Sequence, residues 1–551
     1  MSSSGNQKSA ILGAVLIGAL AGNVGARAAS NDYAGLLALF QDWRAFERPS
    51  MRAGAPDYTA ETLARKYTEL ASYQARCAAI DPSHWPVAQQ VDYQLVRAEM
   101  NGLDFDLRVL KPWARDPAFY HSLRTEQSDT PAYEGPNHYG VIDLWSYPSA
   151  LSRADEQRLA RELAIIPPLL AQARGNLTGN AHDLWLTGIG TMKIQLEDLK
   201  TLAGRTRQSG SELKHAIAAA SQATGEFVRW LEAQAPAKTG PSGVGKDNYT
   251  WSQQHVHLVP LTWDQEVTLL QRELARAHAS LALEEQRNRA LPQLKAAATA
   301  EEYHARAEAA ITKYMAFLKD QDLLTIEPYL DPAMRAHVGE FVPEEQRNFF
   351  QIASHIEPMT LFAHFYHWFD HAWMEHQPNA SPVRREALLS NIWDSRSEGM
   401  ATAMEELILR AGYYDDNPRA REIVYIMLAQ RCARGLASLY AQANEFDIAK
   451  AKAYQVEWTP RGWMRPDLDL LGFEQQLYLR QPGYGSSYVT GKDLIDELIK
   501  DRAHQLGKDF TMRGFFDEFN GSGMIPVSMI HWQLTGALDP ALAATLRQAP
   551  R

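Results

Sequence analysis

The chain has 551 residues, of which 45% are hydrophobic and 22% are charged, so it carries enough apolar side chains for a large folded core. Its formal net charge is -11 and its pI is near 5.9. Because no run of lysine and arginine forms a basic stripe, the sequence gives no reason to expect a nucleic acid partner.

The first predicted element is a secretory signal peptide at residues 1–29. Lys8 precedes an apolar run from Ala10 to Leu20, and Ala26-Arg27-Ala28 fits the A-x-A cleavage pattern. The run is too short to span a bilayer comfortably, and no later stretch has about 20 consecutive apolar residues. We therefore expect a periplasmic or secreted protein whose mature part has no membrane span.

Cys77 and Cys432 are the only cysteines. Neither lies near the expected cleavage point, so a lipid anchor is not expected there. An export compartment permits a disulfide between them. They are far apart in the sequence, however, and two free, buried thiols are the favoured interpretation.

Beyond residue 30 the sequence predicts a long succession of helices. Apolar residues recur at helical spacing, and the strict alternation typical of half-buried strands is nearly absent. The segments with the clearest helical pattern are 59–79, 85–110, 152–203, 212–233, 262–289, 361–376, 397–409, 421–445 and 489–506. The prediction is a mainly α fold.

Two segments interrupt this pattern. Residues 236–247 are rich in glycine and proline and form the plainest linker. Residues 129–137 are also rich in turn-forming residues and fit either a lobe boundary or a loop that lines a cleft. We predict one large helical domain over residues 30–551, with a lobe boundary near 236–247.

Four of the 17 histidines lie in residues 361–376, which contain no proline or glycine. On a regular helix, His364, His367, His371 and Glu375 fall within about 80° of one another, on one face. His367 and His371 have the four-residue spacing at which two imidazoles share a metal ion, and His364 with His367 is also feasible. His364 and His371 lie about 10.5 Å apart along a helix, which is awkward for one ion.

The general base expected of a zinc peptidase is missing from this segment. In the H-E-x-x-H pattern a glutamate follows the first histidine and activates a water molecule. Here Phe365 follows His364, and Trp368 follows His367. Glu375, one turn beyond His371 on the same face, is the first alternative base to consider.

Three fragments are the most specific; they are Glu398-Gly399-Met400-Ala401, Pro482-Gly483 with Tyr488 and Gly491, and Gly523-Met524-Ile525-Pro526. They resemble the E-G-W-A, P-G-x-x-x-x-Y-x-x-G and G-x-l-P patterns of the domain-of-unknown-function 885 family of bacterial proteins. The resemblance to this family is spread from about residue 32 to residue 534. The family resembles helical zinc metallopeptidases, which implies a large multi-helix body with a deep cleft. Its metal motif is H-E-x-x-P-G-H, and the glutamate of E-G-W-A is its third metal ligand.

This resemblance implies a zinc site formed by Glu398 and the histidines at 364, 367 and 371, with Tyr488 facing the metal. A tyrosine there can donate a hydrogen bond to a developing oxyanion. The ordinary alternatives are a packed aromatic ring for Tyr488 and a first-turn glutamate favoured by the helix dipole for Glu398. The chain departs from the family at the metal motif, because the glutamate, proline and glycine are all absent.

Two functions from different classes follow. The first is an exported metallopeptidase-like hydrolase of short peptides. The second is a non-catalytic descendant that binds a peptide, another small ligand or a partner protein in the same cleft. At the site itself three states stay open: a metal with hydrolytic activity, a metal without peptidase activity, and hydrogen-bonded histidines and carboxylates with no ion.

Overall fold

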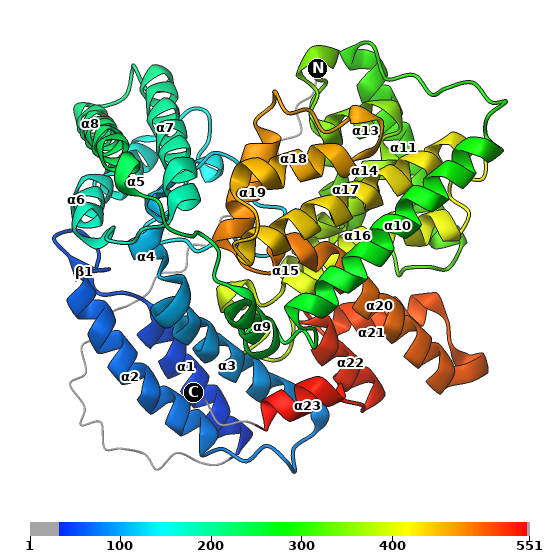
Figure 1. Ribbon diagram of the computed structural model, residues 1–551, viewed down its shortest axis with the longest axis horizontal. Helices are drawn as coiled ribbons and strands as arrows, with labels where there is room; N and C mark the ends of the chain where they lie inside the picture. The colour runs from blue at the N-terminus through cyan, green and yellow to red at the C-terminus, as the bar shows by residue number, and fades with distance from the viewer. Residues whose placement is uncertain (1–31, 548–551) are drawn as a thin grey trace, which may run out of the picture.

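The computed structural model describes residues 32–547, and the predicted signal peptide lies outside them. Within this range the chain is almost entirely helical (Figure 1), which confirms the prediction of a mainly α fold. The described strands have two residues each. They are β1 (Met51–Arg52), antiparallel to β2 (Ala55–Pro56), and β3 (Leu123–Arg124), parallel to β4 (Ile142–Asp143).

Three helices at the start of the chain lie side by side at the lower left of Figure 1. They are α1 (Tyr33–Glu47), α2 (Ala60–Ala78) and α3 (Val87–Phe105). Asp32 begins α1, because its side chain accepts a hydrogen bond of 2.9 Å from the backbone N–H of Gly35. From Val91 onward every residue of α3 is buried, so α3 connects the first helices to the main core.

A small lobe follows at the upper left of Figure 1. Its helices are α4 (Pro112–Arg115), α5 (Arg153–Leu163), α6 (Ile166–Asn176), α7 (His182–Arg205) and α8 (Ser211–Gln234). They enclose a core of their own, with Leu159, Trp185 and Phe227 fully buried. A capping box at Ser152 and Asp155 starts α5.

The remaining helices form the large body of the molecule. They are α9 (Lys246–His255), α10 (Trp263–Arg287), α11 (Ala300–Asp320), α12 (Leu330–Arg335), α13 (Phe349–Ile356), α14 (Met359–Phe362), α15 (Tyr366–His376), α16 (Asp394–Arg410), α17 (Pro418–Gln442), α18 (Ile448–Trp458), α19 (Leu470–Arg480), α20 (Tyr484–Leu506), α21 (Met512–Gly521), α22 (Val527–Thr535) and α23 (Pro540–Leu546). The helices α16, α17 and α20 are buried over most of their length and form its centre.

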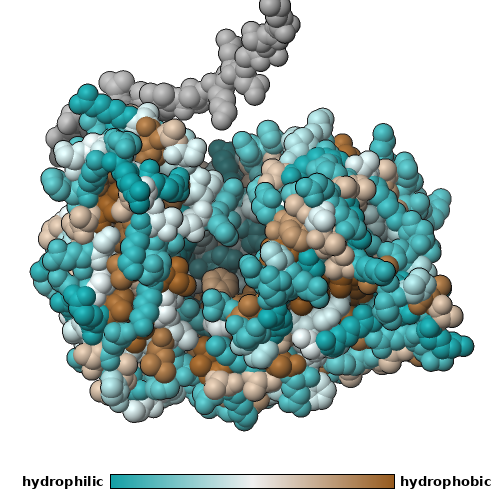
Figure 2. All heavy atoms as spheres, turned by 90° about the horizontal axis from the view of Figure 1, so that it is seen from above, coloured by the Kyte–Doolittle hydropathy of each residue, from teal (hydrophilic) through white to brown (hydrophobic). Residues whose placement is uncertain are grey.

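The segment 236–247 lies between the two bodies. The core of the small lobe ends at Leu231, and the chain rejoins the large core at Val244. Seen from above, Figure 2 shows a recess between the mass that holds the small lobe and the mass that holds the large body. The division of the chain into one domain with a boundary here stays a prediction.

Two further expectations concern the state of the cysteines and the presence of membrane-spanning helices. Cys77 and Cys432 are both buried and free, as the favoured interpretation had it. Between residues 32 and 547, none of the helices has the length and apolar character needed to cross a membrane.

Candidate metal centre

The histidine segment is not one regular helix. After α14, residues Ala363–Phe365 form a turn of 3₁₀-helix, and α15 then starts at Tyr366. A 3₁₀ turn has three residues per turn, so side chains three positions apart lie almost above one another. This local change brings His364 and His367 together.

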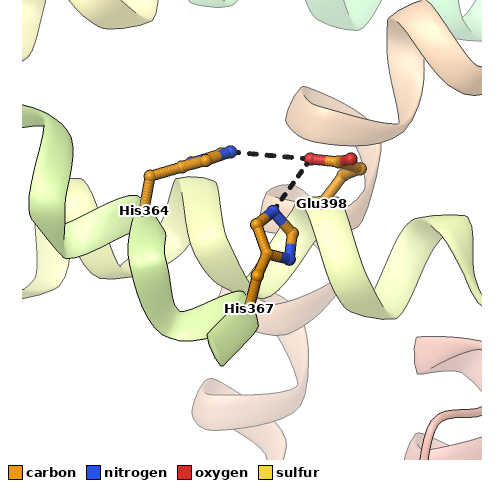
Figure 3. A group of neighbouring side chains, drawn as sticks. All are labelled: His364, His367 and Glu398. Carbon is orange, nitrogen blue, oxygen red and sulfur yellow. Dashed lines mark ion pairs between the residues drawn. The ribbon is translucent and has the colours of Figure 1, made fainter. Parts of the chain in front are cut away.

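Glu398 of α16 lies opposite these two histidines (Figure 3). Its Oε2 atom is 3.5 Å from His364 Nε2 and 3.4 Å from His367 Nε2. All three side chains are buried, and one ligand atom from each lies within 4.8 Å of the others. In the described part of the chain, this is the group of histidine, cysteine and carboxylate side chains with the geometry of a metal site.

The two distances between the Glu398 carboxylate and the imidazole nitrogens fit shared ligation of a metal ion better than a direct ion pair. A charge-assisted hydrogen bond between nitrogen and a carboxylate is about 2.7–2.9 Å long. Two ligand atoms that each lie about 2.0–2.1 Å from a tetrahedral zinc ion are about 3.3 Å apart. Among the described residues, moreover, His367 Nε2 and Glu398 Oε2 are buried and have no hydrogen-bond partner.

The second nitrogen of each imidazole is held by a neighbour. His364 Nδ1 lies 3.0 Å from Glu405 Oε1, and His367 Nδ1 lies 3.1 Å from Ser397 Oγ. Arg431 pairs with Glu405 and also lies 3.2 Å from His364 Nδ1. When Nδ1 donates to Glu405 or to Ser397, the lone pair of Nε2 is free, which is the arrangement found around metal-ligating histidines.

When no metal ion is present, the electrostatics of the group favour a protonated His367 beside an ionised Glu398. Burial opposes charge on His367, but the carboxylate of Glu398 prevails and raises the pKa of His367 to about 9. Burial likewise opposes charge on Glu398, but His367 and His364 hold its pKa well below the usual range. A cation that enters the group therefore replaces the proton of His367.

Tyr488, the predicted oxyanion donor, is buried on the first turns of α20. Its hydroxyl lies 3.2 Å from that of Tyr484, to which it donates. Tyr484 in turn donates a short hydrogen bond to Glu398 Oε1. Sequence reasoning missed Tyr484, although it stands one helical turn before Tyr488 and directly follows Pro482-Gly483.

Two glycines explain why α16 and α20 meet at this point. A Cβ atom added to Gly399 would lie 2.6 Å from Gly491 Cα, and one added to Gly491 would lie 2.2 Å from the carbonyl oxygen of Ser395. The two backbones therefore approach more closely than any larger residue allows. The crossing places Glu398 beside Tyr484. The family-like fragment that begins at Glu398 therefore meets the one that begins at Pro482.

The structure does not bring His371 and Glu375 to this group. His371 Nε2 lies 3.1 Å from the carbonyl oxygen of Asp129, and its ring stacks on Trp368. Glu375 is exposed near the end of α15. The pair of histidines that faces Glu398 is therefore His364 with His367, rather than His367 with His371.

The model of the family described as "Bacterial protein of unknown function (DUF885)" matches residues 46–358, which is more than half of the chain and ends just before the histidine segment. None of the curated proteins matches the sequence.

Two solved structures share the fold. A candidate lipoprotein of unknown function from Shewanella oneidensis aligns with a TM-score of 0.65 and 14% identity, over 91% of this chain and 99% of that one. A candidate lipoprotein from Colwellia psychrerythraea aligns with a TM-score of 0.61 and 14% identity, over 88% of this chain and 92% of that one. These two likenesses concern the fold. Because the family model matches more than half of the sequence, the chain belongs to the DUF885 family of bacterial proteins.

Proposed function

We propose that this protein is an exported, zinc-dependent hydrolase of short peptides, with His364, His367 and Glu398 as the metal ligands. The observation that carries the proposal is the pair of buried, unpartnered atoms, His367 Nε2 and Glu398 Oε2, which face His364 Nε2 within 4.8 Å. Two histidines and a glutamate are the ligand set of several zinc hydrolases.

A bound zinc ion polarises a peptide carbonyl and lowers the pKa of a water molecule to about 7. The chain's own groups hold and complete the site. Burial and the charge of Glu398 keep the pKa values of Tyr484 and Tyr488 well above the ordinary value. Both hydroxyls therefore stay protonated at neutral pH. The Tyr488 hydroxyl, which donates to Tyr484 in this structure, can turn and donate its hydrogen to an oxygen that gains negative charge.

A cavity large enough for a small substrate lies beside the 129–137 loop, and none of the three proposed metal ligands lines it. A cavity of about 390 Å³ is lined by Tyr133 and Gly135 from the 129–137 loop and by Asn391 and Gln481 from the large body. Ligand pockets have volumes of about 300–1,000 Å³. A short peptide fits this range, whereas a folded protein does not.

Export is part of the proposal. It is supported by the predicted signal peptide at residues 1–29 and by the two structural neighbours, which are described as candidate lipoproteins. A periplasmic or secreted location is proposed here.

A second candidate is a non-catalytic protein that binds a peptide, another small ligand or a partner protein in the same place. Phe365 and Trp368, which stand where a catalytic glutamate follows a histidine in zinc peptidases, favour it. In that case a metal, if bound, has a structural or ligand-binding role.

Hydrolysis of a peptide panel by the purified, exported protein distinguishes the two candidates. The hydrolase proposal expects cleavage that stops with a chelator and returns when zinc is added. Tyr488→Phe, which keeps the ring and removes a hydroxyl whose hydrogen-bond partner is Tyr484 rather than a proposed ligand, should lower kcat with little change in zinc content. Peptide binding without cleavage, in protein that contains zinc, would leave the binding protein as the function.

A further inference from the structure

The 129–137 loop, together with Ser128, reaches the edge of the metal centre and is fixed to the large body. Arg480 Nη2 donates a hydrogen bond of 2.9 Å to the carbonyl oxygen of Pro136, and Asn391 Nδ2 donates one of 3.3 Å to that of Tyr133. The backbone N–H of Gly135 donates to the side-chain oxygen of Gln481. The backbone on both sides of Glu134 is therefore held in place.

The side chain of Glu134 points toward the tyrosines of the site. Its Oε1 atom lies 3.5 Å from the hydroxyl of Tyr484, the group that also donates to Glu398, and its Oε2 atom lies 3.3 Å from Ser128 Oγ. Both contacts are long for O–H···O hydrogen bonds, which are usually 2.5–3.0 Å. The carboxylate is thus weakly held, partly exposed and separated from a proposed metal ligand by one hydroxyl group.

Three other carboxylates around the group are already engaged. Asp370 makes two hydrogen bonds to Arg396, of 2.9 and 3.1 Å. Glu405 is paired with Arg431 and His364. Asp394 is 2% exposed and accepts a hydrogen bond from Gln481, so a water molecule beside the substrate does not reach it easily.

We infer that Glu134 is the general base that replaces the missing glutamate of the zinc-peptidase motif, contributed by a loop far away in the sequence. The inference rests on the proposed hydrolase function. It accounts for how a site with Phe365 and Trp368 in the usual positions still has a proton acceptor.

The reaction balances with water as the only co-reactant. Glu134 takes a proton from water as the water oxygen forms a bond to the peptide carbonyl carbon. The protonated Glu134 then gives that proton to the amide nitrogen as the C–N bond breaks. The products are a carboxylic acid and an amine, and Glu134 is again a carboxylate.

Electrostatics support this role. Burial and the neighbouring charges of Asp129 and Glu398 raise the pKa of Glu134 to about 7. A group with a pKa near the working pH can both accept and return a proton. Glu398, whose pKa lies well below the usual range, instead remains a carboxylate suited to a metal.

The test compares Glu134→Gln with two matched variants in the full-length mature protein. Glu375→Gln removes the base that the helix pattern suggests. Glu126→Gln removes an exposed carboxylate from the segment just before the 129–137 loop. Zinc affinity is measured by calorimetry, binding of an uncleaved peptide by tryptophan fluorescence, and kcat with a cleaved peptide. We expect Glu134→Gln to keep zinc and peptide affinity within about threefold and to lose about 10²–10⁴-fold in kcat. The other two variants should stay within about threefold.

A second readout needs no activity. A carboxyl group with a folded pKa of about 7 against an ordinary 4.5 stabilises the fold below about pH 4.5 and loses that effect as the pH rises through 7. In zinc-free protein, Glu134→Gln should therefore gain melting temperature over wild type as the pH rises from 5 to 8. An unchanged difference would show that Glu134 is an ordinary carboxylate.

Different results contradict the hydrolase function and the role of Glu134 as its general base. Full activity in Glu134→Gln, or a loss confined to Glu375→Gln, overturns the role of Glu134 and leaves the hydrolase intact. A loss of zinc from Glu134→Gln makes it a structural support of the site and also overturns the inference. A wild type that neither binds zinc nor cleaves any peptide overturns both.

Discussion

Two buried groups of charged side chains in this molecule are built in different ways. In the first, Asp92 of α3 accepts hydrogen bonds of 2.6–2.7 Å from Arg384, Tyr33 and Ser381. Arg384 uses its remaining nitrogens to donate to backbone and side-chain oxygens at 2.7–2.9 Å. Every polar atom of this pair therefore has a short contact.

The second group is the candidate metal centre, and its central contacts are longer. Glu398 Oε2 lies 3.4 and 3.5 Å from two imidazole nitrogens, and neither it nor His367 Nε2 has a hydrogen-bond partner among the described residues. Buried polar atoms are normally satisfied, so exceptions call for a specific reason. The difference separates a group that holds the fold from one that we propose receives a metal ion.

The largest expected effect concerns stability. Arg384→Met leaves Asp92 buried without its cation and should cost about 3–5 kcal/mol of unfolding free energy. The double variant His367→Gln/Glu398→Gln exchanges both charges for amides, so it should cost less unfolding free energy than Arg384→Met in zinc-free protein. Denaturant unfolding in the presence of a chelator measures both, with Asp92→Asn as a milder variant of the first group. Equal losses of unfolding free energy in Arg384→Met and in the double variant would show that the two groups do not differ in this way.

A smaller effect should appear as a pH dependence of zinc-free protein. The pKa of His367 is about 9 in the fold against an ordinary 6.5. A raised pKa stabilises the fold fully below about pH 6.5, and this contribution is lost as the pH rises through 9. At about 1.4 kcal/mol per pH unit, the loss amounts to about 3 kcal/mol. Melting temperatures from pH 6 to 10 should fall more steeply in wild type than in His367→Gln, and parallel curves would contradict the assigned ion pair.

The smallest effect concerns the neighbour of a ligand. Glu405→Gln keeps the shape of the side chain that contacts His364 Nδ1 but removes its charge. Because such contacts orient the imidazole and raise its basicity, zinc affinity should fall about 10–100-fold. Competition against a chromophoric chelator measures it, and Glu126→Gln is the surface control. An affinity unchanged by the substitution would mean that Glu405 only pairs with Arg431.

Part of this site was readable from the sequence. Helical periodicity predicted the fold class, and the family-like fragments pointed to Glu398 and to the beginning of α20. The 3₁₀ turn at Ala363–Phe365 was not predictable, because nothing in the residues 361–376 marks a break, and it decides which histidines pair. Glu134 and Glu405 reach the site only through packing between distant helices and loops, which periodicity does not encode.

The central claim is that His364, His367 and Glu398 form a metal site, and metal analysis of the mature protein, purified without refolding, tests it most directly. The account predicts about one zinc ion per chain in wild type and none in His367→Gln/Glu398→Gln, with both proteins folded by circular dichroism. A wild type that contains no zinc and takes up none on titration would contradict it, as would a double variant that keeps its zinc.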